Sequence, residues 1–353
     1  MVKKPVKFGK LIRQTIFYLF ITFLAMVILL PTYFLFSLSF MSTREAYEFP
    51  LPMAPALRVD YSMTYGKRGY LLSVFDNNEG DYQTVLDTND LEKMSEYMRY
   101  QLGAPMSILE IEEHVKLLES GTDPVKFTGK RNLWLNYGTF FSITRNAVPA
   151  LIRSLQIAAM TIGISLTIGG LAGYAFARYV FAGRDALKFS VLFVRIFPGV
   201  AIAMPMVIFL ADLGFYDRPI GLSLVYSIGS IALTIWITAS IFLGIPVSLE
   251  EAAVVFGATK FRAFLKITLP LALPGLAAAA MYTFLGAWNE TVSAIILTQF
   301  NPTFSVVVYQ SLLGSVGQVN LAAAGGLVMA LPSVIFTFFI RRYINQMWGG
   351  VTI

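Results

Sequence analysis

Five long stretches of this chain contain no charged residue, and each is long enough to form a transmembrane helix. They cover residues 14–43, 154–177, 219–249, 267–289 and 291–340. About 20 mostly apolar residues are needed for a helix to cross the hydrocarbon core of a bilayer. A further apolar stretch, 189–211, is interrupted only by Arg195, and the last stretch breaks near Asn301-Pro302. We therefore predict six spans, near 15–40, 151–177, 189–212, 220–244, 270–297 and 322–341.

The composition agrees with an integral membrane protein built from helices. Hydrophobic residues make up 56% of the chain and charged residues only 14%, whereas about 25% of the residues in soluble domains are charged. The chain has no cysteine, so no disulfide framework or thiolate site is expected. The first apolar run follows several lysines, but it is too long for a signal peptide and lacks a small-residue cleavage site, so we interpret it as a retained helix.

The distribution of charge predicts the orientation in the membrane. With six spans both termini lie on one side, together with the connection 178–188, the segment 260–266 and Arg341-Arg342. The lysines and arginines gather there, so the positive-inside rule makes that side cytoplasmic. Residues 43–145, on the other side, hold eleven Lys and Arg against fifteen Asp and Glu. The net charge of +6 is therefore a topology signal and gives no support to nucleic-acid binding.

Residues 43–145 differ in character from the rest and predict an extracytoplasmic α+β insertion between the first two spans. Asp90 can cap a helix over 91–101, and Ser107 with Glu110 forms a capping box for a helix over 108–119. Alternating residues predict strands over 70–75 and 82–86, joined by a turn at 77–80. Two interpretations stay open: a small domain that helps to dock a partner, or a variable loop without a role in transport.

A short charged insert, residues 248–276, lies between the fourth and fifth predicted spans on the cytoplasmic side. Ser248 and Glu251 form a second capping box, which predicts a helix over 249–255. Gly257 allows a sharp turn, and residues 259–267 then form an amphipathic helix. A helix pair of this kind is available to a soluble partner; the alternative is a pair lying on lipid headgroups.

This insert resembles the EAA loop of binding-protein-dependent ABC importers. The matching residues are Glu251-Ala252-Ala253-x-x-x-Gly257-Ala258, Ile267-x-Leu269-Pro270 and Pro274-Gly275-Leu276. Other segments extend the resemblance over roughly 136–353, and they indicate the carbohydrate-uptake subfamily and its maltose-type permease with a short Gly-Gly-Val tail. These segments are Gly173-Tyr174-Ala175-Phe176-Ala177-Arg178, Phe197-Pro198, Ala287-Trp288-Asn289-Glu290 and Gly349-Gly350-Val351. Two positions depart from the family pattern: Phe256 stands where Asp is usual, and the tail ends in Val-Thr-Ile.

The resemblance implies a six-helix permease of the type I ABC importer fold in the cytoplasmic (inner) membrane of a prokaryote. It implies a second, homologous permease, two ATPase subunits and an extracytoplasmic solute-binding protein as partners. The permease itself would be no enzyme and would bind no cofactor or metal. ATP and Mg would lie in the partner ATPase, and the chain indeed has no G-x-x-x-x-G-K-[ST] sequence.

The resemblance also implies roles for particular residues and a division of the chain. The loop 246–268 would couple the spans to the ATPase through Glu250, Glu251, Ala252, Ala253, Phe256, Gly257, Ala258 and Phe264. The tail 342–353 would contact the ATPase through Gly349, Gly350 and Val351. The domains would then be 1–42 (tail and first helix), 43–145 (insertion) and 146–353 (transport core).

Two ionisable residues lie inside predicted spans, where charges are costly. Glu290, with Trp288 and Asn289, is a candidate for the translocation path, the alternative being a structural hydrogen bond between helices. Arg195 is expected to reach the cytoplasmic headgroups, and Phe197-Pro198 to kink the third span.

Other functions fit the sequence less well. An importer for another solute, such as glycerol phosphate, a peptide or a polyamine, would share the same motifs. An ion-coupled secondary transporter would need intramembrane carboxylates and inverted repeats, and only Glu290 qualifies. A membrane enzyme lacks a recognisable set of catalytic residues.

Overall fold

The computed structural model describes residues 8–76, 79–144, 146–313 and 318–349. The chain forms two compact units. The first runs up to Ile143 and includes Ser311–Leu327, and the second comprises Thr144–Gln310 together with the chain from Val328. The insertion therefore shares a unit with the first helix, and the transport core predicted from residue 146 begins next to the boundary at Ile143.

Helix α1 (Phe8–Phe40) opens the first unit and carries exposed apolar side chains along most of its length, as a lipid-facing helix does. The short helix α2 (Thr43–Ala46) follows, and α5 (Leu135–Ile143) returns to the end of α1. There the buried amide of Asn136 donates to the carbonyl oxygens of Ser39 (2.8 Å) and Met41 (2.7 Å). This side chain satisfies carbonyls that the end of a helix leaves unpaired.

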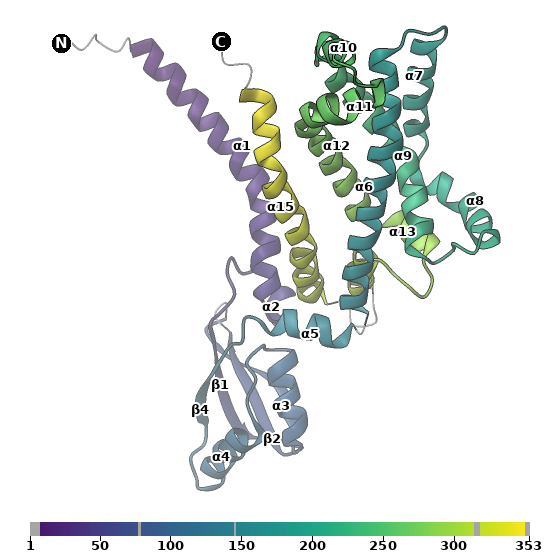
Figure 1. Cartoon of the computed structure of the whole chain (residues 1–353). Coiled ribbons are helices and arrows are strands. Elements are labelled where there is room, and N and C mark those ends of the chain that lie inside the picture. The colour runs from purple at the N-terminus through teal and green to yellow at the C-terminus, as the bar shows by residue number, and fades with distance from the viewer. Residues whose placement is uncertain (1–7, 77–78, 145, 314–317, 350–353) are drawn as a thin grey trace. The chain divides into compact units, whose positions relative to one another are not determined.

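The insertion contains an antiparallel sheet (Figure 1). Its four strands have the order β3-β2-β1-β4. Its strands are β1 (Arg58–Tyr65), β2 (Tyr70–Asp76), β3 (Asp81–Thr88) and β4 (Val125–Lys130). The two predicted strands are confirmed, while β1 and β4 were missed. The alternation of Val59, Tyr61 and Met63 is a signal that could have found β1. Asn77 and Asn78 of the predicted turn lie outside the described residues.

Two helices complete the insertion, and both begin at the predicted caps. Asp90 accepts the backbone N–H groups of Glu92 and Lys93 at the start of α3 (Leu91–Tyr100). Ser107 and Glu110 form the reciprocal capping box of α4 (Ile108–Glu119). The helices and the sheet bury a core of large apolar side chains, among them Tyr61, Met63, Leu72, Met94, Met98 and Ile111. The insertion thus has a hydrophobic core of its own.

Helices are the only regular secondary structure in the described residues of the second unit (Figure 1). Its α-helices are α6 (Ala147–Arg178), α7 (Arg184–Phe193), α8 (Gly199–Asp212), α9 (Pro219–Leu243), α10 (Val247–Val255), α11 (Lys260–Ala263), α12 (Leu269–Asn289), α13 (Val292–Leu297), α14 (Phe304–Leu313) and α15 (Val319–Gly349). A 3₁₀ turn, η1 (Val194–Ile196), follows α7, and a π-helical turn, η2 (Phe264–Thr268), joins α11 to α12. Helices α14 and α15 each have their ends in different units.

Small residues bring α6 and α9 together. A Cβ atom on Gly173 would lie 2.0 Å from Thr238 Oγ1 and 2.9 Å from the backbone nitrogen of Ala239. A Cβ on Gly169 would lie 2.8 Å from the side chain of Thr234. Helices in membranes associate through such close backbone approach. The two glycines therefore set how near α6 and α9 can pack.

Five helices in the described part of the chain are long and apolar enough to cross a membrane, and a bent pair makes a sixth span possible. The bent pair is the predicted third span: residues 184–196 and 199–212 meet at 89° around Phe197-Pro198. The predicted kink is confirmed, and it is a full break. Proline has no backbone N–H and forces the preceding residue into extended backbone, which Phe197 adopts.

The predicted fifth span, 270–297, was wrong at its end. Helix α12 stops at Asn289, Glu290 adopts extended backbone, and α13 is a separate short helix. The reason is a capping interaction, because Glu290 Oε1 accepts the backbone N–H of Ser293 at 2.8 Å. With this bond α13 begins as a separate helix, and the Glu290 carboxylate is held at the break between α12 and α13.

Candidate functional site

The charged insert, residues 248–276, begins with a short exposed helix, α10, followed by a tight turn. The helix is preceded by Pro246, so it begins two residues earlier than predicted. Ser248 lies inside its first turn and makes no side-chain cap, so the predicted Ser248–Glu251 capping box was wrong. Proline is favoured at helix starts because it needs no hydrogen-bonding partner for an N–H group.

The turn after α10 is closed entirely by backbone groups. The N–H of Ala258 donates to the carbonyl of Ala253 (3.0 Å), and that of Gly257 to the carbonyl of Val254 (2.9 Å). Gly257 has a φ of +89°, which a glycine adopts without strain. These bonds form the Schellman arrangement of a helix C-terminus. The turn thus needs no side chain at Phe256.

A buried carboxylate fastens α10 to the ends of three other elements. Glu250 accepts hydrogen bonds from Arg178 Nε (2.8 Å), Tyr174 Oη (2.7 Å) and Thr268 Oγ1 (2.7 Å). Arg178 also donates to the carbonyls of Phe242 (2.7 Å) and Ile245 (3.1 Å) at the end of α9. We call Glu250, Arg178, Tyr174 and Thr268 the Glu250 anchor. It joins α6, α9, α10 and η2.

The anchor keeps its carboxylate ionised although it is largely buried. Burial alone would raise the pKa of Glu250, but the hydrogen bonds from Thr268, Tyr174 and Arg178, together with the guanidinium charge, lower that pKa below its ordinary value. The ring of Phe264 packs against Tyr174 with 4.5 Å between centroids and is itself buried. Phe264 thus covers the anchor on its apolar side.

The residues predicted for coupling therefore fall into two groups. Glu251, Ala252, Phe256 and Gly257 are exposed, whereas Ala253 and Ala258 are half-buried. Phe264 is buried, and Glu250 is half-buried and bound by Arg178, Tyr174 and Thr268, so both position α10. At the apolar end of the helix, the predicted Phe256 is 91% exposed, and Val255, which sequence reasoning missed, is 83% exposed. Gly349 ends α15, and Gly350 and Val351 lie outside the described residues.

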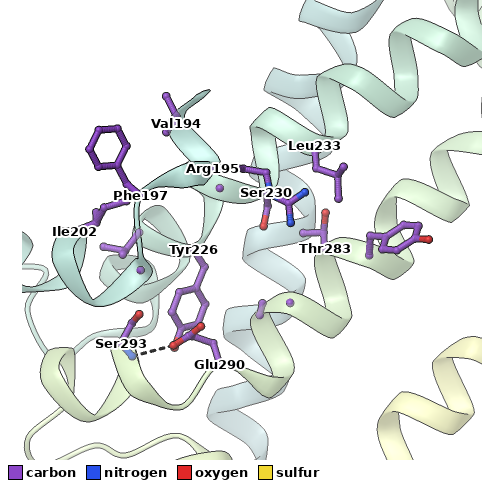
Figure 2. A pocket seen from close by; sticks show the side chains of 16 residues that line it. Val194, Arg195, Phe197, Ile202, Tyr226, Ser230, Leu233, Thr283, Glu290 and Ser293 are labelled. Atoms are coloured by element: carbon purple, nitrogen blue, oxygen red, sulfur yellow. Dashed lines mark hydrogen bonds between the residues drawn. The ribbon is translucent and has the colours of Figure 1, made fainter. Parts of the chain in front are cut away.

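A cavity of about 300 Å³ lies at the break between α12 and α13 (Figure 2). We call it the Glu290 cavity. Its wall includes Glu290 and Ser293 from the break, Tyr226 and Ser230 from α9, Thr283 from α12, and Arg195 from η1. The break in the third span and the break in the fifth thus meet at one site.

The three residues predicted for the translocation path are separated by the structure. Glu290 lines the cavity. Trp288 is buried, and its indole N–H donates to the carbonyl of Met329 (2.8 Å). Asn289 is exposed and does not line the cavity. Arg195 is exposed, and its side chain lines the cavity beside Ser230 in Figure 2. Its expected reach to the headgroups stays a prediction.

Arg178, Tyr174 and Tyr226 are site residues that sequence reasoning did not single out. Arg178 carried a signal, since an arginine ending a long apolar helix needs a partner for its charge. Nothing in the sequence distinguishes Tyr226 from the other tyrosines, because the chain has seventeen of them. Within the described residues, no group of three or more His, Cys, Asp or Glu side chains could hold a metal ion.

Comparison with known proteins places this architecture in a family. The sequence profile of the family described as "binding-protein-dependent transport system inner membrane component" matches residues 165–348. This range contains α10 and its turn, the four residues of the Glu250 anchor, and the residues that line the Glu290 cavity.

Two curated relatives and one solved structure agree with this match. The trehalose transport system permease protein SugB of Mycobacterium tuberculosis is 34% identical over 205 residues, covering 55% of this chain and 73% of that protein. The maltodextrin transport system permease protein MalD of Streptococcus pneumoniae is 28% identical over 225 residues, covering 62% and 80%. A chain of a bacterial ABC transporter involved in the import of alginate superposes with a TM-score of 0.59 at 18% identity, covering 97% of this chain and 100% of that one. At that coverage the fold likeness includes the insertion.

Proposed function

The chain belongs to the binding-protein-dependent transport system inner membrane components, and we propose that it is one permease subunit of an ATP-driven carbohydrate importer. The family and the apolar helices make it a multi-pass membrane protein of a transport system. The sugar substrate is supported by relatives named for trehalose and maltodextrin transport. In this proposal the chain contributes to the translocation pathway, and a solute-binding protein delivers the sugar.

Helix α10 is proposed as the coupling helix that enters the partner ATPase. Its exposed end, formed by Val255 and Phe256, suits an apolar cleft. Because the Glu250 anchor fastens α10 to α6, α9 and η2, a displacement of the helix would be passed to the spans. Binding to the ATPase must differ between the inward-facing and outward-facing states, since otherwise ATP would not shift their populations.

The proposed assembly contains a second, homologous permease, two ATPase subunits and the binding protein. ATP and Mg would be held by the ATPase, and the termini would lie in the cytoplasm. Gly349, Gly350 and Val351 would contact the ATPase. The insertion would face the binding protein. Deleting residues 60–130 tests this last assignment, because transport should fall while the ATPase still assembles; unchanged transport would rule out docking.

The observation that carries the proposal is the exposed α10 mounted on a buried anchor. It is tested by affinity purification of the chain from its native membrane in mild detergent. The wild type should bring down a P-loop ATPase, and the variant Glu251→Lys/Gly257→Asp should lose it. The first change reverses an exposed charge, and the second places a side chain where φ is +89°, which strains the turn.

The matched control is Glu96→Lys, the same charge reversal on an exposed residue of α3 in the insertion. It should keep the ATPase. If wild type and variant both purify without an ATPase, α10 is no coupling helix and the importer proposal fails.

A further inference from the structure

Nine consecutive residues at the start of the insertion, 49–57, have no charged or polar side chain. Their sequence is Phe-Pro-Leu-Pro-Met-Ala-Pro-Ala-Leu, and all nine are described and lie outside any helix or strand. Phe49 is 95%, Met53 70% and Leu57 68% exposed. We call this segment the apolar loop. An exposed apolar patch of this kind marks a contact with a protein or with a membrane.

The apolar loop is tied to α1 at a level that lies within the membrane interface. The carbonyl of Met53 accepts hydrogen bonds from Tyr33 Oη (2.7 Å) and Ser37 Oγ (3.0 Å). A helix rises about 1.5 Å per residue, so these two residues lie about 10 and 5 Å before the end of α1 at Phe40. The apolar part of α1, Arg13–Phe40, has 28 residues and measures about 42 Å, which is the thickness of a bilayer with its headgroups. The loop is therefore held about 5–10 Å inside the edge of the bilayer, where interfacial segments lie.

The backbone of the apolar loop is suited to this depth. Three of its nine residues are prolines, which have no N–H group that would need a partner. The N–H of Ala56 donates to Glu45 Oε1 at 2.9 Å, and the carbonyl of Ala56 accepts from Arg131 Nη1 at 3.2 Å. Unpaired backbone groups are costly where water is scarce. Prolines and side-chain partners thus lower the cost of placing this irregular segment in the interface.

A tryptophan from the other end of the insertion lies at the same end of α1. Trp134, directly before α5, is 69% exposed, and its ring contacts Phe40 edge-on with 5.5 Å between centroids. Tyr137 lies 5.5 Å from both rings. Tryptophan and tyrosine gather at membrane–water interfaces, because their rings are apolar and carry a polar group. These aromatic residues therefore mark the end of α1 as the interface level.

We propose that the apolar loop and Trp134 insert into the lipid headgroup layer on the side of the membrane where the insertion lies. The partner of this surface is the phospholipid bilayer itself. The loop is bound to a transmembrane helix below the edge of the bilayer, so a water-soluble protein would have to enter the headgroup layer to reach Met53. The contact holds the base of the insertion at the membrane, whichever solute is transported.

Fluorescence quenching in the full transport complex tests the insertion into lipid. The chain has no cysteine, so Met53→Cys introduces one thiol into this subunit for a bimane label, and the unchanged complex gives the labelling background. The complex is placed in vesicles of phosphatidylethanolamine and phosphatidylglycerol, with added phosphatidylcholine that carries a nitroxide near the headgroup end of an acyl chain. We expect this lipid to reduce the emission at least about twofold, because the side chain lies among the lipids.

Ser120→Cys, at an exposed position after α4, is the matched control. Its label should be quenched by iodide in the water and not by the nitroxide lipid, whereas the label at Met53→Cys should show the opposite pattern.

A second probe tests whether the apolar side chains cause the insertion. With bimane at Leu51→Cys, the change Phe49→Glu should lower the quenching by nitroxide lipid to the level of the Ser120→Cys control, because a carboxylate is costly to remove from water. Tyr65→Glu, at an exposed aromatic residue of β1, should leave the quenching unchanged.

Three results would contradict the proposal. Quenching of the Met53→Cys label by iodide and not by the nitroxide lipid would overturn the insertion into lipid. Shielding from iodide without quenching by the lipid would also overturn it, and would assign the apolar loop to a protein interface. Lipid quenching that persists in the Phe49→Glu variant would overturn the role of the apolar side chains. Recovery of the ATPase tests the proposed function separately from all three.

Discussion

The core of the insertion is packed with large apolar side chains, whereas the interface of α6 with α9 is packed with small residues. The insertion buries large side chains such as Tyr61, Leu72 and Met94. The α6–α9 interface instead meets at Gly169, Gly173 and the threonines facing them. In water, removing large apolar surface from the solvent drives folding. In lipid that gain is absent, so close backbone approach and van der Waals contact take its place.

Enlarging a contact residue should therefore harm the membrane interface most. We expect Gly173→Leu to abolish assembly of the complex, because even a Cβ at this position would lie 2.9 Å from the backbone of α9, which cannot move aside. Gly163→Leu, on the exposed side of the same helix with no atom near its Cβ position, should be tolerated. Size-exclusion chromatography in detergent measures both. Equal behaviour of the two variants would contradict the close packing of α6 on α9.

The Glu250 anchor is a third kind of contact, buried and ionic. Arg178→Ala leaves Glu250 without its charged partner, at a cost of about 3–5 kcal/mol, and it frees α10 from the end of α9. We expect sugar transport to fall at least tenfold. The double variant Arg178→Met/Glu250→Leu should recover thermal stability in detergent, since replacing both partners by apolar groups removes the unpaired charge. A double variant as unstable as the single one would disprove this account.

Replacing a large core residue by a smaller one should destabilise the insertion and leave the fold of the second unit unchanged. Leu72 is fully buried, and Leu72→Ala should destabilise the insertion by about 2–5 kcal/mol. We expect faster proteolysis within residues 58–130 and unchanged recovery of the ATPase. Phe75→Ala, at a partly exposed position of the same strand, should have a smaller effect. Loss of the ATPase from the Leu72 variant would show that the second unit depends on the folding of the insertion.

Acid should weaken the anchor by a smaller amount. The pKa of Glu250 in the folded protein lies below its ordinary value of about 4.5. Its stabilising contribution is therefore complete above that value and is lost as the pH falls through the lower, folded-state pKa. We expect α10 to become more accessible to protease below about pH 4.5. Glu250→Gln should lack this step, and a step retained in that variant must come from another group.

Several local features could be predicted because they depend on neighbours in sequence. The caps at Asp90 and Ser107 formed as expected, since each side chain bonds to amides two or three residues away. The break at Phe197-Pro198 follows from proline alone. The same reasoning failed at Ser248, because the start of α10 depends on Pro246 and Glu250 is bound by residues far along the chain. It failed again at Glu290, whose bond to Ser293 ended the fifth span early.

The sequence by itself determined that the chain is a multi-pass membrane protein, roughly where most of its apolar helices lie, and that a polar insertion with α-helices and strands follows the first of them. Apolar length, charge distribution and caps are properties of contiguous residues, so they can be seen without a fold. Only the tertiary structure decided that Arg178 holds Glu250, and that Arg195, Tyr226 and Glu290 share one cavity. These residues come from η1, α9 and the break between α12 and α13. Tertiary packing brings segments together that are distant in the sequence, and a pattern of neighbouring residues cannot predict these contacts.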